Sequence, residues 1–325
     1  MHTIGTPLMW IGFSVVVVVA LAVDLLMMKS KGPHKVDTRE ALWWSAGWIA
    51  LALLFNLGLW WYLNGVMPPE EAKHIALQFF TGYLVEKALA VDNIFVFLML
   101  FTYFAVPPVQ QQRALIYGII GAIVLRAILI FIGAALIQQF HWVLYIFGAF
   151  LVFTGVKMLW GAGEEMDVGA NPLLNWIRKR FPITSDYHGT RFTIREHGTR
   201  WFTPLFVVVV MIGITDVIFA VDSIPAIFAI TDDPFIVLTS NVFAVLGLRA
   251  LFFLLAGMAD KFHLLVYGLA TVLIFIGAKM LIADIWHIPI GAALVVVAVA
   301  IAASMIASVL ITPRDEGGGK PSDSP

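Results

Sequence analysis

Four acidic side chains lie in the middle of long apolar stretches of this sequence. Glu86 and Asp92 are six residues apart, and Asp216 and Asp222 repeat that spacing 130 residues later. The second acid of each pair ends the tripeptide Ala-Val-Asp. A charge at the centre of a membrane helix costs about 2.5–3.5 kcal/mol on insertion scales, so such residues usually face a cavity, an ion or a partner. These four carboxylates are therefore the first candidates for a functional site.

Two further oxygen donors accompany the acids. Asn93 and Ser223 each follow the first acid of their pair by seven residues, and they therefore share its helix face. Two such helices packed antiparallel can present four carboxylates, an amide oxygen and a hydroxyl to one central space. Hard oxygen ligands suit Mn²⁺, Mg²⁺ or Ca²⁺ better than Cu⁺ or Zn²⁺. The pattern predicts a site for a divalent cation, whose charge would offset the mutual repulsion of the acids.

Basic residues in the same apolar stretches leave a second interpretation open. The acids can instead pair with Lys87, Arg126 and Arg249 as inert salt bridges within the membrane, although buried pairs are weak evidence for stability. The acids can also relay protons, which is compatible with metal transport. We favour Arg126 and Arg249 as counter-charges to the acids in the ion-free state, with a role in gating.

Asp24 and Asn56 are lesser candidates for the ion pathway. Asp24 ends a third copy of Ala-Val-Asp in the first apolar stretch, five residues before Lys29, where water can reach it. Its sequence context favours a place on the pathway. Asn56 lies in the second apolar stretch, where a polar residue most often joins two helices and less often contacts an ion.

The composition predicts an all-α polytopic membrane protein. Of the 325 residues, 61% are hydrophobic and 13% are charged, about half the charged fraction of a soluble domain. The apolar residues fall into runs of roughly 20, enough to cross a bilayer as a helix. The chain has no cysteine, so disulfides, thiolate metal sites and CxxC redox centres are excluded. The net charge of −1 gives no reason to expect a nucleic-acid partner.

We expect a single membrane domain, 1–325, with nine spans in the lipid bilayer. The first apolar run has no basic segment before it and no small-residue cleavage site after it, so it is a retained helix and not a signal peptide. The predicted spans are 8–28, 43–63, 75–103, 115–137, 141–160, 204–230, 235–257, 263–283 and 288–311.

An internal repeat organises these spans. Arg126 and Arg249 follow the two acidic pairs, and Lys157 and Lys279 follow in turn, near span ends where they can simply snorkel. Each repeat has three spans, an odd number, so the second copy runs oppositely across the bilayer, as in many secondary transporters. Their sites lie near the midplane, often where a helix breaks, and Pro225 predicts such a break in the second copy.

The remaining parts follow from composition and charge. The loop 161–203 holds a basic amphipathic segment, 171–181, that can lie on the anionic inner leaflet, and a predicted hairpin at His197 and Gly198. With the N-terminus outside and the C-terminus inside, 14 of the 20 lysines and arginines are cytoplasmic, as the positive-inside rule requires. The expected parts are a helix pair 1–63, repeat 1 at 75–160, the cytoplasmic loop 161–203, repeat 2 at 204–283, a last helix 288–311 and a disordered tail 312–325.

Three segments carry a family resemblance. They are Leu89-Ala-Val-Asp-Asn93, Asp216-Val-Ile-Phe-Ala-Val-Asp-Ser-Ile-Pro-Ala226 and Asp233-Pro-Phe-Ile-Val-Leu-Thr-Ser-Asn241. They resemble the TerC family of bacterial inner-membrane proteins, in its Alx-like branch, and the likeness covers about residues 3–312. The resemblance implies inverted three-helix repeats related to the LysE-type exporters, manganese export and, from the family's name, tellurium resistance. By motif position it implies these metal-pathway residues: Glu86, Asp92, Asp216 and Asp222.

The leading hypothesis is a secondary transporter that exports Mn²⁺ from the cytoplasm, with proton antiport as a candidate coupling. The metal is then a transported ion, and we expect no prosthetic group. The alternative is a membrane scaffold that delivers metal to envelope proteins, whose protein partners the sequence does not name. An intramembrane enzyme is disfavoured, because the chain has no P-loop, nucleophile elbow or HExxH motif. Asp92 and Asp222 also lack the glycine that usually stands next to the catalytic aspartate of an intramembrane hydrolase, since Asn93 and Ser223 follow them.

One position departs from the family pattern. Members of the family usually carry a glutamate three residues before the aspartate that matches Asp216, and Gly213 stands there in this chain. The departure removes a carboxylate one helical turn from Asp216. It implies that fewer charges surround the ion, or that transport is weak or altered.

We predict that Gly213→Glu strengthens Mn²⁺ binding, because it restores a hard oxygen ligand one helical turn from Asp216. Titration of the purified variant with Mn²⁺ measures the change. Gly213→Gln, which adds similar bulk without the charge, is the control. Unchanged affinity in the glutamate variant would count against an ion site at this position.

Overall fold

The computed structural model describes residues 3–31, 37–160, 172–196, 199–256, 264–286 and 288–311, without the side chains of residues 27–31, 92, 172, 173 and 178. The predicted disordered tail, 312–325, and the residues expected at the hairpin turn, His197 and Gly198, lie outside these ranges. Helices make up most of the described chain, and the predicted all-α class of polytopic membrane protein is confirmed.

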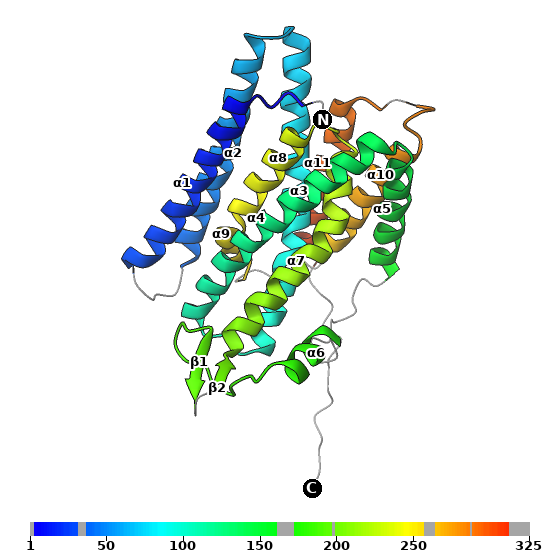
Figure 1. Cartoon of the computed structure of the whole chain (residues 1–325). Helices are drawn as coiled ribbons and strands as arrows, with labels where there is room; N and C mark the ends of the chain where they lie inside the picture. The colour runs from blue at the N-terminus through cyan, green and yellow to red at the C-terminus, as the bar shows by residue number, and fades with distance from the viewer. Residues whose placement is uncertain are drawn as a thin grey trace.

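The described helices and strands follow one another in the order α1–α6, β1, β2 and α7–α11 (Figure 1). The strands β1 (Thr193–Glu196) and β2 (Thr199–Phe202) pair antiparallel, with Arg195 opposite Arg200. The helices are α1 (Pro7–Lys31), α2 (Thr38–Asn64), α3 (Pro69–Tyr103), α4 (Pro108–Gln139), α5 (Val143–Trp160), α6 (Pro172–Arg180), α7 (Pro204–Phe228), α8 (Pro234–Leu246), α9 (Leu248–Ala256), α10 (Leu265–Leu281) and α11 (Ile290–Leu310).

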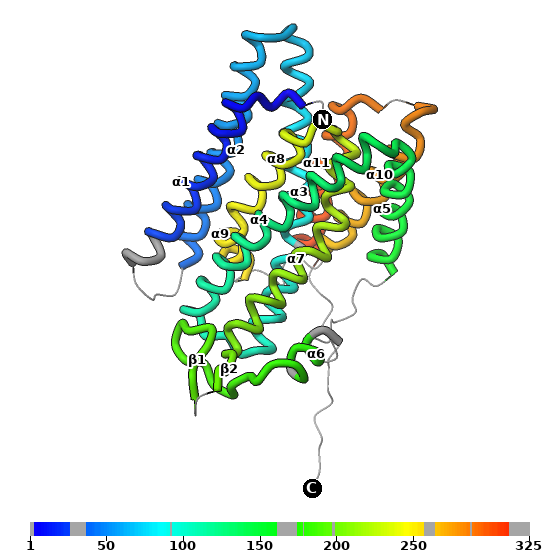
Figure 2. The backbone as a smooth tube through the Cα atoms, in the orientation of Figure 1, coloured from blue at the N-terminus to red at the C-terminus, as the bar shows by residue number. Residues whose placement is uncertain are grey.

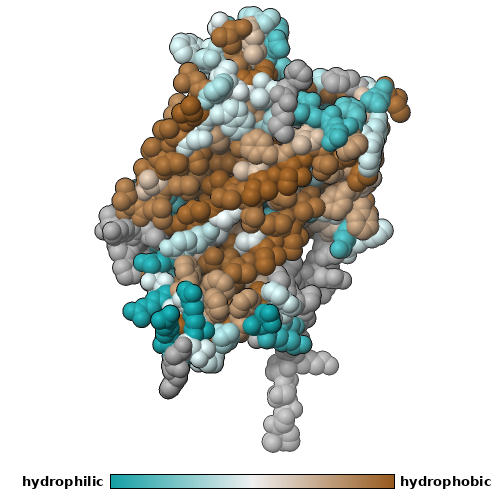
Figure 3. Space-filling view, in the orientation of Figure 1, coloured by the Kyte–Doolittle hydropathy of each residue, from teal (hydrophilic) through white to brown (hydrophobic). Residues whose placement is uncertain are grey.

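Length and apolar composition qualify six of the described helices as membrane spans: α1, α2, α4, α5, α7 and α11. The pair α8 and α9 makes a seventh if it counts as one span bent by 41°. The other two of the nine predicted spans stay predictions, because α3 carries charged residues in mid-helix and α10 has only 17 residues. Figure 3 shows an apolar belt across the middle of the molecule, which suits contact with lipid.

The break in the second repeat is not at the predicted place. The prediction of a break at Pro225 is wrong, because α7 runs unbroken to Phe228. Pro225 lies in the last turn of the helix, where its own carbonyl still accepts from the N–H of Ala229 at 3.0 Å. A proline there disturbs only one helical hydrogen bond near the end. The described break lies instead at Gly247, between α8 and α9.

Four helices, α3, α4, α7 and α8, form the centre of the bundle. α4 packs on α7 and α8, α3 packs on α7 and α8, and every residue of α8 is buried. In the views of Figures 1 and 2, α1 and α2 lie along one side and α5 and α10 along the other, with α6 and the hairpin at one end. The central helices can therefore hold polar side chains away from lipid.

α5 and α10 pack against each other along a seam of small residues. A Cβ atom placed on Gly277 would lie 2.6 Å from the carbonyl oxygen of Gly148, and one on Gly155 would lie 2.8 Å from that of Ala270. In the predicted repeat, Gly155 corresponds to Gly277 and Gly148 to Ala270. The contacts are therefore reciprocal, as an approximate two-fold axis would make them, and they support the predicted inverted repeat.

The segment expected to be a cytoplasmic loop holds α6 and the hairpin. Leu174 and Ile177 are buried in the bundle core, so this apolar side of α6 packs on protein and does not lie in the leaflet. The Tyr187 hydroxyl donates to the carbonyl oxygen of Phe104, at the end of α3, at 2.8 Å. Burial raises the pKa of Tyr187 to about 12, so the hydroxyl stays a proton donor at neutral pH.

We predict that Gly277→Ala destabilises the fold by about 1–3 kcal/mol, because the added methyl group meets a backbone carbonyl that no rotamer change can move. Thermal unfolding of the purified protein in detergent measures this loss. Gly121→Ala in α4 is the matched control, since a Cβ there would meet no atom within 4 Å. Equal unfolding temperatures for the two variants would contradict a tight seam.

Candidate functional site

A buried arginine lies at the centre of the bundle. Arg126, in the middle of α4, has no solvent exposure. Its guanidinium donates to Glu86 of α3 through Nη1. It also donates to Asp216 of α7, with an Nε–Oδ2 distance of 3.0 Å and an Nη2–Oδ1 distance of 2.9 Å. A buried charge is tolerated when opposite charges and hydrogen bonds compensate it, and this cluster supplies both.

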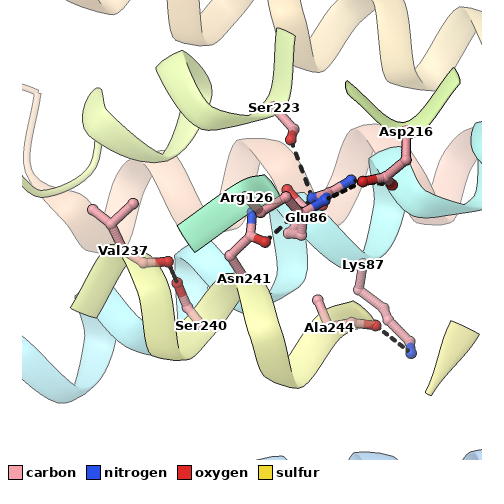
Figure 4. A network of polar contacts seen from close by, with 9 residues as sticks. All are labelled: Glu86, Lys87, Arg126, Asp216, Ser223, Val237, Ser240, Asn241 and Ala244. Atoms are coloured by element: carbon pink, nitrogen blue, oxygen red, sulfur yellow. Dashed lines mark hydrogen bonds and ion pairs between the residues drawn. The ribbon is translucent and has the colours of Figure 1, made fainter. Parts of the chain in front are cut away.

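Two neutral side chains complete the surroundings of the Arg126 guanidinium (Figure 4). Its Nη1 atom lies 3.5 Å from Oγ of Ser223 on α7 and 3.3 Å from Oδ1 of Asn241 on α8. Ser223 follows Asp216 by two helical turns, so the spacing within α7 turns both toward the same cation. Side chains from α3, α4, α7 and α8 thus meet at one guanidinium.

A cavity of about 370 Å³ lies beside this cluster. Most of its wall is apolar, and the Thr154 hydroxyl of α5 donates to Oδ1 of Asp222 at 3.3 Å. Asp222 therefore belongs to the cavity and has no described contact with Arg126. The polar residues of the wall come from α3, α5 and α7: Glu86, Asn93, Thr154, Lys157, Asp222 and Ser223.

Two buried oxygen atoms of the cavity residues have no hydrogen-bond donor among the described residues. They are Oε2 of Glu86 and Oδ1 of Asn93, on side chains of residues that are 0% and 2% exposed. Leaving a buried acceptor without a partner costs about 1–3 kcal/mol, and more for a charged group. A cavity lined by such oxygens is suited to receive a cation.

Glu86, Asp216 and Asp222, the three predicted acids whose side chains the structure describes, do not gather in one group. Among the residues that the structure describes, no three histidine, aspartate or glutamate side chains lie close enough to hold a metal ion. Glu86 and Asp216 share Arg126 instead, while Asp222 lines the cavity. The backbone of Asp92 lies in α3, and its side chain is outside the description.

The other predicted counter-charges have other partners. Arg249 of α9 forms an ion pair with Asp24 of α1, so this pair forms away from the repeat acids. Lys87 donates to the carbonyl oxygen of Ala244 at 3.2 Å. Among the described contacts, Arg126 alone of the three predicted counter-charges reaches the acids of the repeats.

Asn56 and Gly213 do not line the cavity. The side-chain oxygen of Asn56, in α2, is buried without a described partner. Gly213 lies in α7 one turn before Asp216, and a Cβ atom there would meet nothing within 4 Å. The Cβ atom of a glutamate introduced at this position would therefore not clash with its surroundings.

Three residues join the site although the spacing of the acids did not identify them. Asn241 contacts Arg126, and it ends the third segment that carries the family resemblance. Thr154 and Lys157 line the cavity with Asp222, and both lie in the repeated motif that includes the lysine expected to snorkel. The signal that could have found them is a polar side chain inside a repeated apolar segment.

Comparison with known proteins places this architecture in a family. Residues 71–316 match the family described as "Integral membrane protein TerC family". A protein of Salmonella typhi named "Putative membrane-bound redox modulator Alx" is 55% identical over 297 residues, 91% of this chain and 92% of its own length. A protein of the same name from Photorhabdus laumondii is 51% identical over 311 residues, 96% and 97% of the two chains. The "Uncharacterized membrane protein STKORF319" of Myxococcus xanthus is 45% identical over 308 residues, 95% and 94%. No solved structure matches the chain.

We predict that Arg126→Met destabilises the protein by about 3–5 kcal/mol, because two buried carboxylates lose their counter-charge. Thermal unfolding in detergent measures the loss. Adding Glu86→Gln and Asp216→Asn removes the unpaired charges and should recover most of the stability. Wild-type stability of the single variant, or no recovery in the triple variant, would contradict this account of the cluster.

Proposed function

Because the chain belongs to the TerC family of integral membrane proteins, we propose that it is a secondary transporter that exports a divalent metal ion, with Mn²⁺ as the preferred ion. The ion site is the cavity beside Arg126, with oxygen donors from Glu86, Asn93, Asp222 and Ser223. Asp216 and Asp92 complete the acidic path. The metal is the substrate in this scheme, and the chain needs no prosthetic group for it.

The observation that carries this proposal is the pair of unpaired oxygens in the cavity. Glu86 Oε2 and Asn93 Oδ1 are buried acceptors without a described donor, and a carboxylate of Asp222 and a hydroxyl of Ser223 line the same space. Carboxylate, amide and hydroxyl oxygens are hard ligands that suit Mn²⁺ or Mg²⁺. The apolar wall around them lowers the local dielectric constant, which strengthens their attraction for a cation.

Arg126 supports a transport cycle in which the acids exchange one cation for another. With no metal bound, the guanidinium is the positive partner that Glu86 and Asp216 share. A divalent ion that enters the cavity competes for Glu86, so its arrival weakens the hold of Glu86 on Arg126. The buried carboxylates keep a positive partner in both states, which avoids the large penalty of an isolated buried charge.

Direction and coupling follow from the resemblance and from the titratable groups. The family resemblance implies export through the bacterial inner membrane, and the excess of basic residues in the predicted inner loops supports an orientation with the N-terminus outside. Protons compete with metal for carboxylates, so proton antiport is the proposed coupling.

The name of the Alx relatives connects them with redox modulation. Thiol–disulfide exchange by the side chains of this chain is excluded, since it has no cysteine. A transporter of a redox-active metal ion such as Mn²⁺ would instead act on redox balance through the concentration of that ion.

Mn²⁺ flux in proteoliposomes tests the proposal. We expect Glu86→Gln, Asp92→Asn and Asp222→Asn each to reduce flux at least about tenfold, because each removes a charged ligand worth about 1.4 kcal/mol or more. Glu70→Gln is the matched control, since Glu70 is exposed in the first turn of α3 and should leave flux unchanged.

Wild-type flux in all three variants would exclude the proposed site. A membrane scaffold would show no flux in the unaltered protein, and an intramembrane enzyme would form a turnover product without flux.

A further inference from the structure

A second cavity, of about 210 Å³, lies toward the other end of the seam between α5 and α10. Its wall includes His74 and Gln78 near the start of α3, Leu144 near the start of α5, and Lys279 and Met280 near the end of α10. We call it the Lys279 cavity. In Figure 1 the start of α3 and the end of α10 lie at the end of the molecule away from α6 and the hairpin. The cavity proposed for the ion, the ion cavity, instead uses the last turns of α5 and the first half of α10.

The internal repeat relates the walls of these two cavities. Lys157 and Met158 of α5 line the ion cavity, while the equivalent Lys279 and Met280 of α10 line the Lys279 cavity. A lysine and a methionine in the same order at each end are the arrangement that an approximate two-fold axis produces.

A third position shows the same exchange of helices. Val266 of α10 lies in the wall of the ion cavity, and Leu144 of α5 lies in the wall of the Lys279 cavity. Each precedes the lysine of its own repeat by 13 residues. The Lys279 cavity is therefore the counterpart, in the inverted repeat, of the part of the ion cavity around Lys157.

The two cavities differ in the ligands that they offer a cation. Among the described residues that line the Lys279 cavity there is no carboxylate. The ion cavity has Asp222, which accepts from the Thr154 hydroxyl. The repeat equivalent of Thr154 is Ile276, an apolar residue that is 2% exposed. A cation is therefore bound more weakly in the Lys279 cavity than in the ion cavity.

The carboxyl end of α7 faces the Lys279 cavity. Lys279 Nζ donates to the carbonyl oxygen of Ala229 at 3.3 Å, and Gln78 donates to that of Ile230 at 3.5 Å. All four residues line this cavity. The last carbonyl oxygens of a helix lack helical donors and carry partial negative charge. The Lys279 ammonium therefore occupies a place that attracts cations, and its charge repels a metal ion that enters this cavity.

Only a short stretch of protein separates the two cavities. Along α7, Ser223 lines the ion cavity and Phe228 lines the Lys279 cavity, and the four residues between them are buried. These positions are five residues apart, a rise of about 7.5 Å along a helix. On α3, Gln78 and Glu86 are eight residues apart, or about 12 Å. A rearrangement of α3 and α7 over one or two turns would therefore connect the cavities.

We infer that the Lys279 cavity is the second access to the ion path, through which the divalent ion leaves the protein after the ion cavity. Lys279 is a gating residue there, because its ammonium lowers the affinity for the released ion and opposes its return. The inference rests on the proposed function. The predicted orientation puts the start of α3, and with it this access, on the outer side of the membrane.

Cysteine labelling from the two faces of the membrane tests this access, because the chain has no cysteine of its own. Met158→Cys and Met280→Cys are matched reporters in the two cavities. A permanently charged methanethiosulfonate reagent does not cross the bilayer, so each reporter should react at least about tenfold faster from its own face. We expect Met158→Cys to react from the inner face and Met280→Cys from the outer face. Ala283→Cys, a smaller change in the same wall, replaces Met280→Cys if that variant does not fold.

Filling the second access should stop transport. Labelling of Met280→Cys from the outer face should abolish most of the Mn²⁺ flux in proteoliposomes, because the attached group fills the Lys279 cavity. Val66→Cys is the control, since Val66 is 63% exposed in the turn between α2 and α3, near the same end of α3. It should be labelled from the same face and leave flux unchanged.

The charge of Lys279 is tested by the apparent KM for Mn²⁺ on each face. Lys279→Gln should lower the KM on the outer face by about fivefold, because it removes a repelling charge close to the ion, and should leave the inner-face KM within about twofold. Lys157→Gln, at the equivalent position of the ion cavity, should leave the outer-face KM unchanged. A merely structural role of Lys279 would change both faces alike, and that result would overturn its part as a gate.

The outcomes separate this inference from the proposed function. If flux depends on Glu86 and Asp222 but both reporters react from the same face, or if labelled Met280→Cys transports normally, the second access fails and the transport site stands. If the unaltered protein carries no Mn²⁺, the proposed function fails, and the second access fails with it because there is no ion path to reach.

Discussion

A guanidinium without access to water determines how the polar side chains at the centre of this protein are arranged. Arg126 stays charged under all ordinary conditions and carries five N–H donors, so the bundle must supply acceptors wherever it lies. It draws them from α3, α7 and α8 while itself standing on α4. The relative positions of four helices therefore depend on one side chain. The acids that pair with it are also acids to which the proposed function assigns the metal ion.

This double use of the acids limits the conformations that the centre can adopt. Glu86 and Asp216 cannot be left without a positive partner, and Arg126 cannot be left without a negative one. In the proposed transport cycle, a metal ion and the guanidinium must therefore replace each other in a concerted way. Asp222 and Asn93 lie outside the arginine cluster, on the cavity side, so the proposed function gives an entering ion two ligands that do not bind Arg126.

The sequence predicts which polar residues of one helix share a face. It does not predict contacts between residues on helices that are far apart in the chain. The spacing of Asp216 and Ser223 predicts a shared face, and both contact Arg126. The family and the all-α class also follow from motif and composition. The partner of Arg249 could not be predicted, because Asp24 lies 225 residues away. Asn241 has no acidic neighbour at helical spacing, and Pro225 breaks no helix because it stands in the last turn.

The seam between α5 and α10 has a mechanical consequence. Its closest contacts join glycines to backbone carbonyl oxygens of the facing helix, which cannot move by a change of rotamer, so the two helices have little freedom to slide. The two helices therefore behave as one rigid unit. This unit forms part of the cavity wall, through Thr154 and Lys157 on α5 and Leu273 on α10. In the proposed transport cycle this wall therefore stays in place, and the shape of the cavity changes from the side of α3 and α7.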